Sequence, residues 1–312
     1  MKRKKFQKKY IGNGGCRMKK RRIFSNLNDK EFAWVLYDVG NSAYTMLACA
    51  LIPIWFKAMA IGTRPGQLTS DQATAYYSMA IAVITIVVAL LGPVCGAISD
   101  HKGMKKIFFT TTVAVGVSGC ILNGFAYQWI AFLLLFAVTK IFYNMSLMFY
   151  DSMLNDITTE ERMDEVSSYG FAWGYLGSCI PFLIALVAYV LGPDMAGMIP
   201  GRVSMAIGFA VTGLWWLLVT IPLMKNYKQL NYVEHQGHAV GNAFRKIFQT
   251  VKFIATEDKK VFFFLTAFFL YIDGVGTIID NCINIGTDLN LSTVGQVICL
   301  LALSLIHISE PT

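Results

Sequence analysis

The sequence is short of charged residues. Only 15% of its 312 residues are Asp, Glu, Lys or Arg, whereas an average soluble domain carries about 25%. The deficit is concentrated in nearly uncharged stretches of about twenty residues, the length that crosses a bilayer core roughly 30 Å thick. Because 55% of the residues are also apolar, the composition excludes an ordinary soluble fold and predicts an integral membrane protein.

Motifs for metals, cofactors and covalent catalysis are also missing. The seven cysteines are scattered without a CxxC spacing, and His235 and His238 form an isolated pair, so neither a metal site nor a cofactor is expected. A glycine-rich patch at residues 12–15 lacks the lysine of a phosphate loop. No nucleophile, base or metal set is recognisable. We therefore expect no enzyme activity, and a lipid-modifying enzyme is the weakest alternative.

Eight apolar runs are long enough to span a membrane, and all should be helical because lipid requires internal backbone pairing. The expected fold class is therefore an all-α membrane protein. The runs cover roughly residues 32–57, 73–99, 107–127, 129–151, 166–191, 203–224, 261–285 and 293 onward.

Positive charge indicates the orientation of these spans. Residues 1–24 hold eleven Lys or Arg and no acid. With the N-terminus in the cytoplasm, twenty-three of the 27 Lys and Arg lie on the inner side, three lie outside, and Lys140 lies within a span. The positive-inside rule therefore predicts a cytoplasmic N-terminus. The basic tail is expected to bind anionic lipid, and no nucleic-acid partner is expected.

A long polar segment divides the chain into two groups of spans. The expected organisation is a basic cytosolic tail (1–31), a six-helix bundle (32–224), a cytosolic linker (225–260), the start of a second bundle (261–303) and a non-native tail (304–312). The last segment resembles translated adaptor sequence. Apolar residues from Val240 to Ile254 recur at helical spacing, which predicts a basic amphipathic helix on the inner leaflet or docked on the bundle.

The two groups of spans share a short sequence pattern. Residues 36–41 read LYDVGN and residues 270–275 read LYIDGV, so each first helix of a group places Leu-Tyr, an acid and a glycine at a corresponding depth. Parallel six-helix repeats build the major facilitator fold. The pattern predicts that fold, with a complete first bundle and the first two helices of a second, C-terminally truncated bundle.

Polar residues inside three spans are the candidates for a translocation path, because ionisable groups in lipid are costly. They share helix faces in spans one, four and seven, the spans that line the central cavity of the major facilitator fold. The alternative is that Asp38 and Asp273 only cap or cross-link helices. A buried pair of Lys140 with Asp38 or Asp273 could couple proton or substrate binding to transport. The path residues are Asp38, Asn41, Ser42, Thr45, Lys140, Asn144, Asp273, Thr277 and Asp280.

The loop between spans two and three resembles the major facilitator signature G-x-x-x-D-[R/K]-x-G-[R/K]-[R/K]. His101 departs from it at a position that is usually basic. Glycine permits the tight reversal of the chain, and the aspartate offers a carboxylate to a helix end or a basic side chain. The resemblance implies a cytosolic conformational latch made of Gly96, Asp100, Gly103, Lys105 and Lys106.

Small residues also repeat every four positions in two spans. They are Gly170, Gly174 and Ser178 in span five, and Gly92 and Gly96 in span two. Such spacing lets helices approach one another closely, so we interpret both sets as packing faces. A gated backbone hinge is the alternative.

Residues 34–44 (WVLYDVGNSAY) resemble the W-x-L-Y-D-x-x-N-S-A-[YF] opening of one family. Weaker matches extend to about residue 290, among them 170–177 (GFAWGYLG) and 269–275 (FLYIDGV). This family is the bacterial branch of the vacuole-effluxer-like major facilitators, related to fungal autophagy-linked vacuolar amino-acid effluxers. The resemblance implies twelve helices and an efflux carrier for amino acids. This chain departs from it by stopping in its eighth helix.

The expected function is secondary active transport of a small polar solute, an amino acid or similar, by alternating access in the cell (inner) membrane. A small-molecule solute and a coupling proton or ion are the expected partners. A non-transporting membrane scaffold and a truncated remnant are the alternatives. Span five lacks the glycine-proline antiporter signature, which disfavours drug/proton antiport.

Overall fold

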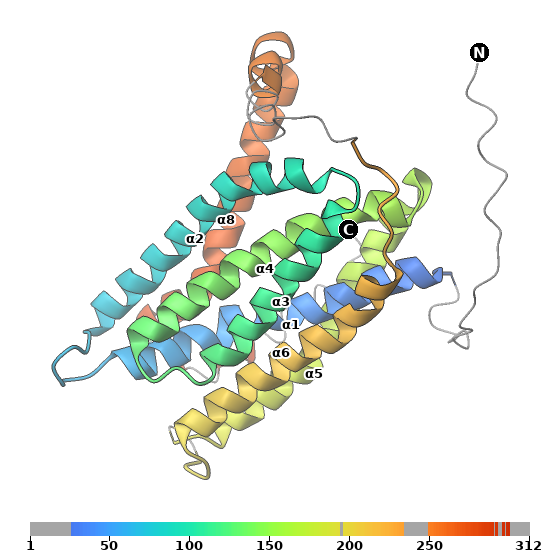
Figure 1. Cartoon of the computed structure of the whole chain (residues 1–312). Helices are drawn as coiled ribbons and strands as arrows, with labels where there is room; N and C mark the ends of the chain where they lie inside the picture. Colours follow the sequence, from blue (N-terminus) through green and yellow to red (C-terminus); the bar gives the residue numbers. More distant parts are fainter. Residues whose placement is uncertain are drawn as a thin grey trace, which may run out of the picture.

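The structure is a computed structural model that describes residues 26–193, 196–233 and 249–289, together with 291, 292, 295, 296, 298 and 299. Within them it is an all-α bundle with seven helices long and apolar enough to cross a membrane (Figure 1). These are α1 (Asp29–Ala60), α2 (Ser70–Ser99), α3 (Met104–Asn123), α4 (Trp129–Ile157), α5 (Met163–Val190), α6 (Gly201–Asn226) and α8 (Lys259–Asp288).

Seven of the eight expected spans are therefore helices. The eighth span and the amphipathic helix expected from Val240 fall largely outside the described residues, as do the basic tail up to residue 25 and the C-terminal segment 304–312. Six of the seven helices are longer than the apolar runs, whereas α3 ends at Asn123, before the expected residue 127. For example, α4 continues to Ile157, because the terminal turns of a spanning helix are polar and hydropathy does not register them.

Local sequence explains where several helices begin. Asn28 accepts hydrogen bonds from the backbone N–H groups of Lys30 and Glu31, and the Glu31 carboxylate accepts one from the Asn28 N–H in return. This capping box satisfies donors that the first turn of α1 would otherwise leave free. Gly103 precedes α3 with φ +76°, a left-handed conformation that glycine adopts without strain.

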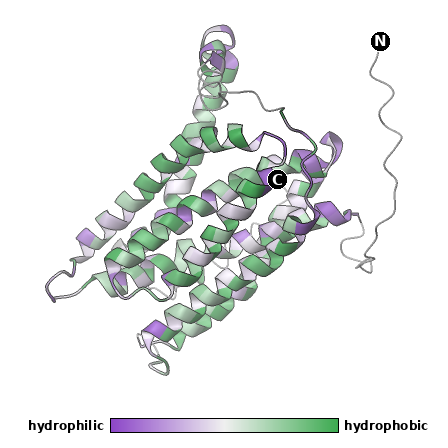
Figure 2. Cartoon of the chain, viewed as in Figure 1, coloured by the Kyte–Doolittle hydropathy of each residue, from purple (hydrophilic) through white to green (hydrophobic). Residues whose placement is uncertain are grey.

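Helix α1 lies at the centre of the bundle and packs against α2, α4, α5, α6 and α8, while α3 packs against α4 and α6. Apolar side chains cover the spanning parts of the helices and polar residues gather near their ends (Figure 2). One end, here called the linker end, holds residues 26–31, 99–106, 155–165 and 227–233, which contact one another there. The opposite end holds residues 60–69, 124–129, 191–193 and 196–202.

Helix α8 meets the bundle near the opposite end. The Cys282 thiol donates to the Cys49 carbonyl of α1 at 3.8 Å, and the Ser78 hydroxyl of α2 bonds the Asn281 amide oxygen at 3.2 Å. The preceding turns of α8, from Lys259 to Ile279, are exposed within the described part of the chain. Figure 1 shows α8 alongside α2, with its first turns extending beyond the bundle.

Glycines permit close helix contacts at some of the expected positions. A Cβ atom on Gly170 would lie 2.9 Å from the Trp34 ring, and one on Gly174 would lie 2.9 Å from the Ser42 hydroxyl. Packing thus explains the span-five glycines. The span-two glycines are looser, because Cβ atoms on Gly92 and Gly96 would meet only Met148, at 3.5 and 4.0 Å.

The close approach of Gly116 to the fully buried ring of Trp216 generates the first prediction. A Cβ on Gly116 would lie 2.7 Å from Cη2 of Trp216, whose ring has no free volume to move into. Gly116→Ala is therefore expected to destabilise the protein by about 1–3 kcal/mol. The measurement is thermal unfolding in detergent, followed by tryptophan fluorescence. Gly92→Ala is the matched control and should unfold at the wild-type temperature or above. Equal midpoints for the two variants would contradict this packing.

Candidate functional site

A cavity of about 370 Å³ lies between α1, α4 and α5. It contains four of the predicted path residues, all from α1, which follow one another at helical spacing on one face. Its lining comprises Trp34, Asp38, Asn41, Ser42, Thr45, Met46, Tyr143, Leu147, Tyr150, Asp151, Leu154, Ser167, Phe171, Tyr175 and Ser178.

The α1 residues in this cavity are already partly paired. The Asp38 carboxylate accepts a hydrogen bond from the Asn41 amide at 3.1 Å. The Thr45 hydroxyl is bonded to the Tyr143 hydroxyl of α4 at 2.5 Å. Asp151 is exposed on α4, and its carboxylate makes no hydrogen bond or ion pair with another described residue. The cavity therefore holds two carboxylates with little neutralisation.

Aromatic side chains form one wall of the cavity. The Trp34 and Tyr150 rings are stacked with centroids 4.2 Å apart and an interplanar angle of 13°. The Trp34 indole N–H donates to the Tyr150 carbonyl at 3.1 Å, which fixes the indole orientation. The Tyr150 hydroxyl is buried and has no hydrogen-bond partner among the described residues.

Helix α5 supplies a wall that sequence reasoning missed. Ser167, Phe171, Tyr175 and Ser178 line the cavity. Of these, only Ser178 belongs to the repeat of small residues, which we interpret from the sequence as a packing face. Their spacing of four, four and three residues places them on one helix face, which was the available signal. Gly174 brings this face close to α1, since its Cβ would lie 3.2 Å from Asp38 Oδ2.

A second polar contact joins α4 to α8. The Lys140 ammonium donates to the Asp280 carboxylate at 2.9 Å, and the two side chains are 10% and 22% exposed. The hypothesis of a Lys140 pair therefore needs a different partner, because the ammonium bonds neither Asp38 nor Asp273. Lys140 lies eleven residues from the start of α4 and Asp280 eight from the end of α8. At 1.5 Å per residue the pair lies in the opposite half of the bundle from Asp38.

Three predicted path residues belong to neither group. Asn144 is half-buried on α4 but does not line the cavity, and Asp273 and Thr277 are exposed on α8. The three polar stripes therefore do not converge on one site. The α1 stripe lines the cavity, while the α4 and α8 stripes meet through Lys140 and Asp280.

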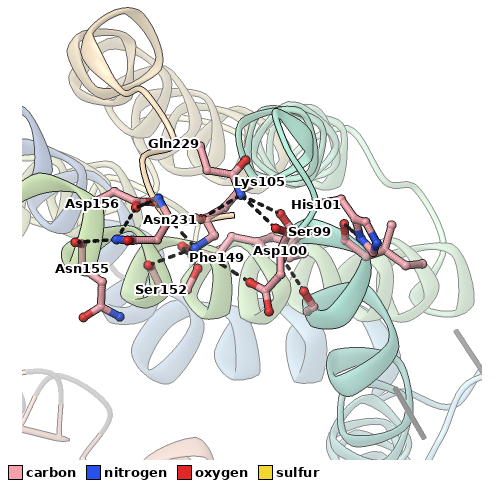
Figure 3. Close-up of polar contacts among 12 residues, drawn as sticks. Ser99, Asp100, His101, Lys105, Phe149, Ser152, Asn155, Asp156, Gln229 and Asn231 are labelled. Carbon is pink, nitrogen blue, oxygen red and sulfur yellow. Dashed lines mark hydrogen bonds and ion pairs between the residues drawn. The ribbon is translucent and has the colours of Figure 1, made fainter. Parts of the chain in front are cut away.

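Two of the predicted latch residues, Asp100 and Lys105, lie among the polar contacts of the linker end (Figure 3). Lys105 is buried, donates to the Ser152 carbonyl at 3.3 Å and lies 3.7 Å from Asp156 and 4.0 Å from Asp100. The geometry thus gives Asp100 a basic neighbour at the start of α3, one of the two roles expected for this carboxylate.

The other latch residues have looser surroundings. Gly103 forms the left-handed turn, Gly96 lies beside Met148, and Lys106 is half-buried. A latching role for these residues stays a prediction.

Asp156 is the residue around which the linker end is organised, and sequence reasoning did not single it out. Its buried carboxylate accepts hydrogen bonds from the Tyr227 hydroxyl (2.5 Å), the Leu230 N–H (3.2 Å) and the Asn231 N–H and amide (2.8 and 2.9 Å). Burial, together with the bond to Asp156, raises the pKa of Tyr227 well above its usual value, so this hydroxyl remains a donor at ordinary pH.

The same segment also reaches the loop between α2 and α3. The Val233 N–H donates to the Asp100 carbonyl at 2.8 Å, and the Gln229 amide donates to the Ser99 carbonyl at 3.2 Å. The first residues after α6 are therefore fixed to the end of the bundle on two sides. An acid at the end of a spanning helix carries no motif of its own, so no sequence signal identified Asp156.

The chain has a bundle of six packed spanning helices, then a polar segment and a further spanning helix, and ionisable residues lie within the spans. These features define a multi-pass membrane protein of the major facilitator class. The chain belongs to the vacuole effluxer Atg22-like family, whose profile matches residues 28–308. It is similar to an uncharacterized MFS-type transporter, YxiO, of Bacillus subtilis (strain 168), with 38% identity over 283 residues. The match covers 89% of this chain and 65% of the relative's length.

The buried contacts of Asp156 generate the second prediction. Asp156→Ala would remove the buried carboxylate nearest to the Lys105 ammonium and the acceptor of several donors after α6, and removing one partner of a buried ion pair costs about 3–5 kcal/mol. We expect a lower unfolding temperature and faster trypsin cleavage after Lys225 or Lys228, because the segment after α6 is released. Asn155→Ala is the control, since the Asn155 side chain is exposed. Wild-type cleavage rates in Asp156→Ala would disprove the anchoring role.

Proposed function

We propose that this protein is a secondary active carrier that moves a small polar solute, an amino acid or a similar compound, across the cell membrane by alternating access. The family description favours efflux, and the relative in B. subtilis is named as a transporter. We further propose that the N-terminus and the linker end face the cytoplasm, which agrees with the distribution of Lys and Arg along the chain.

The observation that carries this proposal is the ion pair between Lys140 and Asp280. It connects the six-helix bundle to the first helix of the following group, α8, which is the boundary that opens and closes in a carrier built from two bundles. The contacts of α8 with the bundle gather near the pair, at Cys282 and Asn281. Toward the linker end α8 is exposed. Within the described part of the chain, the contacts between α8 and the bundle are thus concentrated at the opposite end.

The pair is suited to a reversible closure. An isolated charged Lys or Asp has a high free energy when it is shielded from water, so each residue stabilises the other when this end is closed. When water enters, both ions become hydrated and their attraction falls to the small value of an exposed pair. The free-energy difference between the two states is therefore small enough for solute binding to shift it.

The cavity lies toward the linker end. Asp38 lies nine residues after the start of α1 and Asp151 six residues before the end of α4, which puts them about 14 and 9 Å along their helices from the linker end. We therefore propose that a solute reaches these carboxylates from the linker end.

The third prediction tests the ion pair in the complete protein reconstituted in liposomes. Lys140→Ala should lower exchange of a labelled mixture of standard amino acids and their amines by at least about tenfold, which corresponds to about 1.4 kcal/mol of the barrier. The reversed pair, Lys140→Asp with Asp280→Lys, should recover part of the rate because the attraction is restored. Lys228→Ala, an exposed lysine outside the spans, should exchange at the wild-type rate.

Two results would count against the proposal. Exchange by Lys140→Ala at the wild-type rate and with the same pH dependence would exclude a role for the pair. Failure of the wild-type protein to exchange any component of the mixture would contradict the proposed solute class.

A further inference from the structure

We propose that the cavity between α1, α4 and α5 selects cationic solutes, in particular amines with an aromatic or apolar body, over zwitterions and anions. This inference rests on the proposed carrier function in that it names the class of solute, but it concerns equilibrium binding at one cavity. It narrows the expectation of an amino-acid substrate, because none of the described residues that line the cavity has a positive charge to bind a carboxylate.

The first support is the charge of the lining. Asp38 and Asp151 come from different helices, and none of the residues that line the cavity is Lys, Arg or His. The intramembrane ammonium of Lys140 is bonded to Asp280 instead. The carboxylate of Asp38 is half-buried, so it attracts a cation more strongly than it would in water and repels an anion to the same extent. Asp151 is exposed and adds a second negative charge at the cavity. The free carboxylate of an amino acid would therefore oppose the binding of its own ammonium group.

The second support is the aromatic wall. Trp34, Tyr143, Tyr150, Phe171 and Tyr175 all line the cavity, and stacking with Tyr150 holds the Trp34 ring in a fixed plane. Aromatic faces attract ammonium groups electrostatically, with Trp the strongest, and they also pack well against an aromatic or aliphatic body. One solute with a cationic head and an apolar body would satisfy both features of the lining.

The volume sets the size of the solute. At about 370 Å³ the cavity is at the lower end of the range of small-molecule sites, roughly 300–1,000 Å³. It therefore suits a monoamine of the size of a decarboxylated amino acid.

The fourth prediction is the test, made by calorimetric titration of the complete protein in lipid nanodiscs. The probes share one phenol ring and differ in charge: tyramine (cation), tyrosol (uncharged), tyrosine (zwitterion) and 4-hydroxyphenylacetate (anion). Tyramine should bind at least about tenfold more tightly than any of the others. Asp38→Asn and Asp151→Asn should each weaken tyramine binding by about tenfold or more, while Asp164→Asn, an exposed acid on α5 that does not line the cavity, should leave it unchanged.

Because Asp151 is exposed and unpaired, Asp151→Asn keeps the test valid even if Asp38→Asn does not fold. Equal affinities for tyramine and tyrosol, wild-type affinity in both Asp variants, or no binding of tyramine would each overturn the inference. Exchange of amino acids without tyramine binding would leave the carrier function intact and reject only the cation preference. Tyramine binding without exchange of any solute would support the cavity and reject the carrier.

Discussion

Apolar helices in a bilayer gain little by exchanging lipid for one another, so close packing of their surfaces has to hold a bundle together. Helix α1 meets this constraint on several sides at once. Gly40 would place a Cβ 2.6 Å from Val219 of α6, and Gly170 and Gly174 bring the α5 backbone against Trp34 and Asp38. The cavity and the contact between α8 and the bundle both depend on this close packing of α1. Helix α1 provides one wall of the cavity and also the surface that the end of α8 contacts.

Charge inside the bundle is handled in three ways. At the linker end, Asp156 satisfies a buried lysine and the segment after α6, so the charge is balanced within the protein. Near the opposite end, Lys140 is balanced by Asp280 from another helix, and this balance lasts only while α8 stays in place. In the cavity, no Lys or Arg among the described lining residues balances Asp38 and Asp151. The Asp156 contacts, the proposed reversible pair of Lys140 and Asp280, and the candidate binding cavity thus differ in the source of the compensating charge.

Much of the fold could be predicted because each spanning helix has to carry about twenty apolar residues by itself, and that property is local. The α1 stripe from Asp38 to Thr45 could also be predicted, since helical spacing alone puts its members on one face. The partner of Lys140 could not be predicted from the sequence. Asp273 and Asp280 share a face of α8, and which of them reaches Lys140 depends on the axial position and crossing of two helices far apart in sequence. The role of α5 was missed because its glycines already had a sufficient explanation in packing.

The positions of Asp273 and Thr277 connect the cavity to the ion pair. They precede Asp280 by seven and three residues, so all three lie on one face of α8, the face that Asp280 turns toward α4. A solute bound only to α1, α4 and α5 makes no contact that distinguishes one position of α8 from another, and a ligand without differential contacts cannot shift a conformational equilibrium. Coupling between solute and conformation therefore requires groups on α8 that reach the solute in only one state. If the exposed turns of α8 close on the cavity, Asp273 and Thr277 are the polar side chains on the approaching face, and a cationic solute would then be shared between carboxylates of both helix groups.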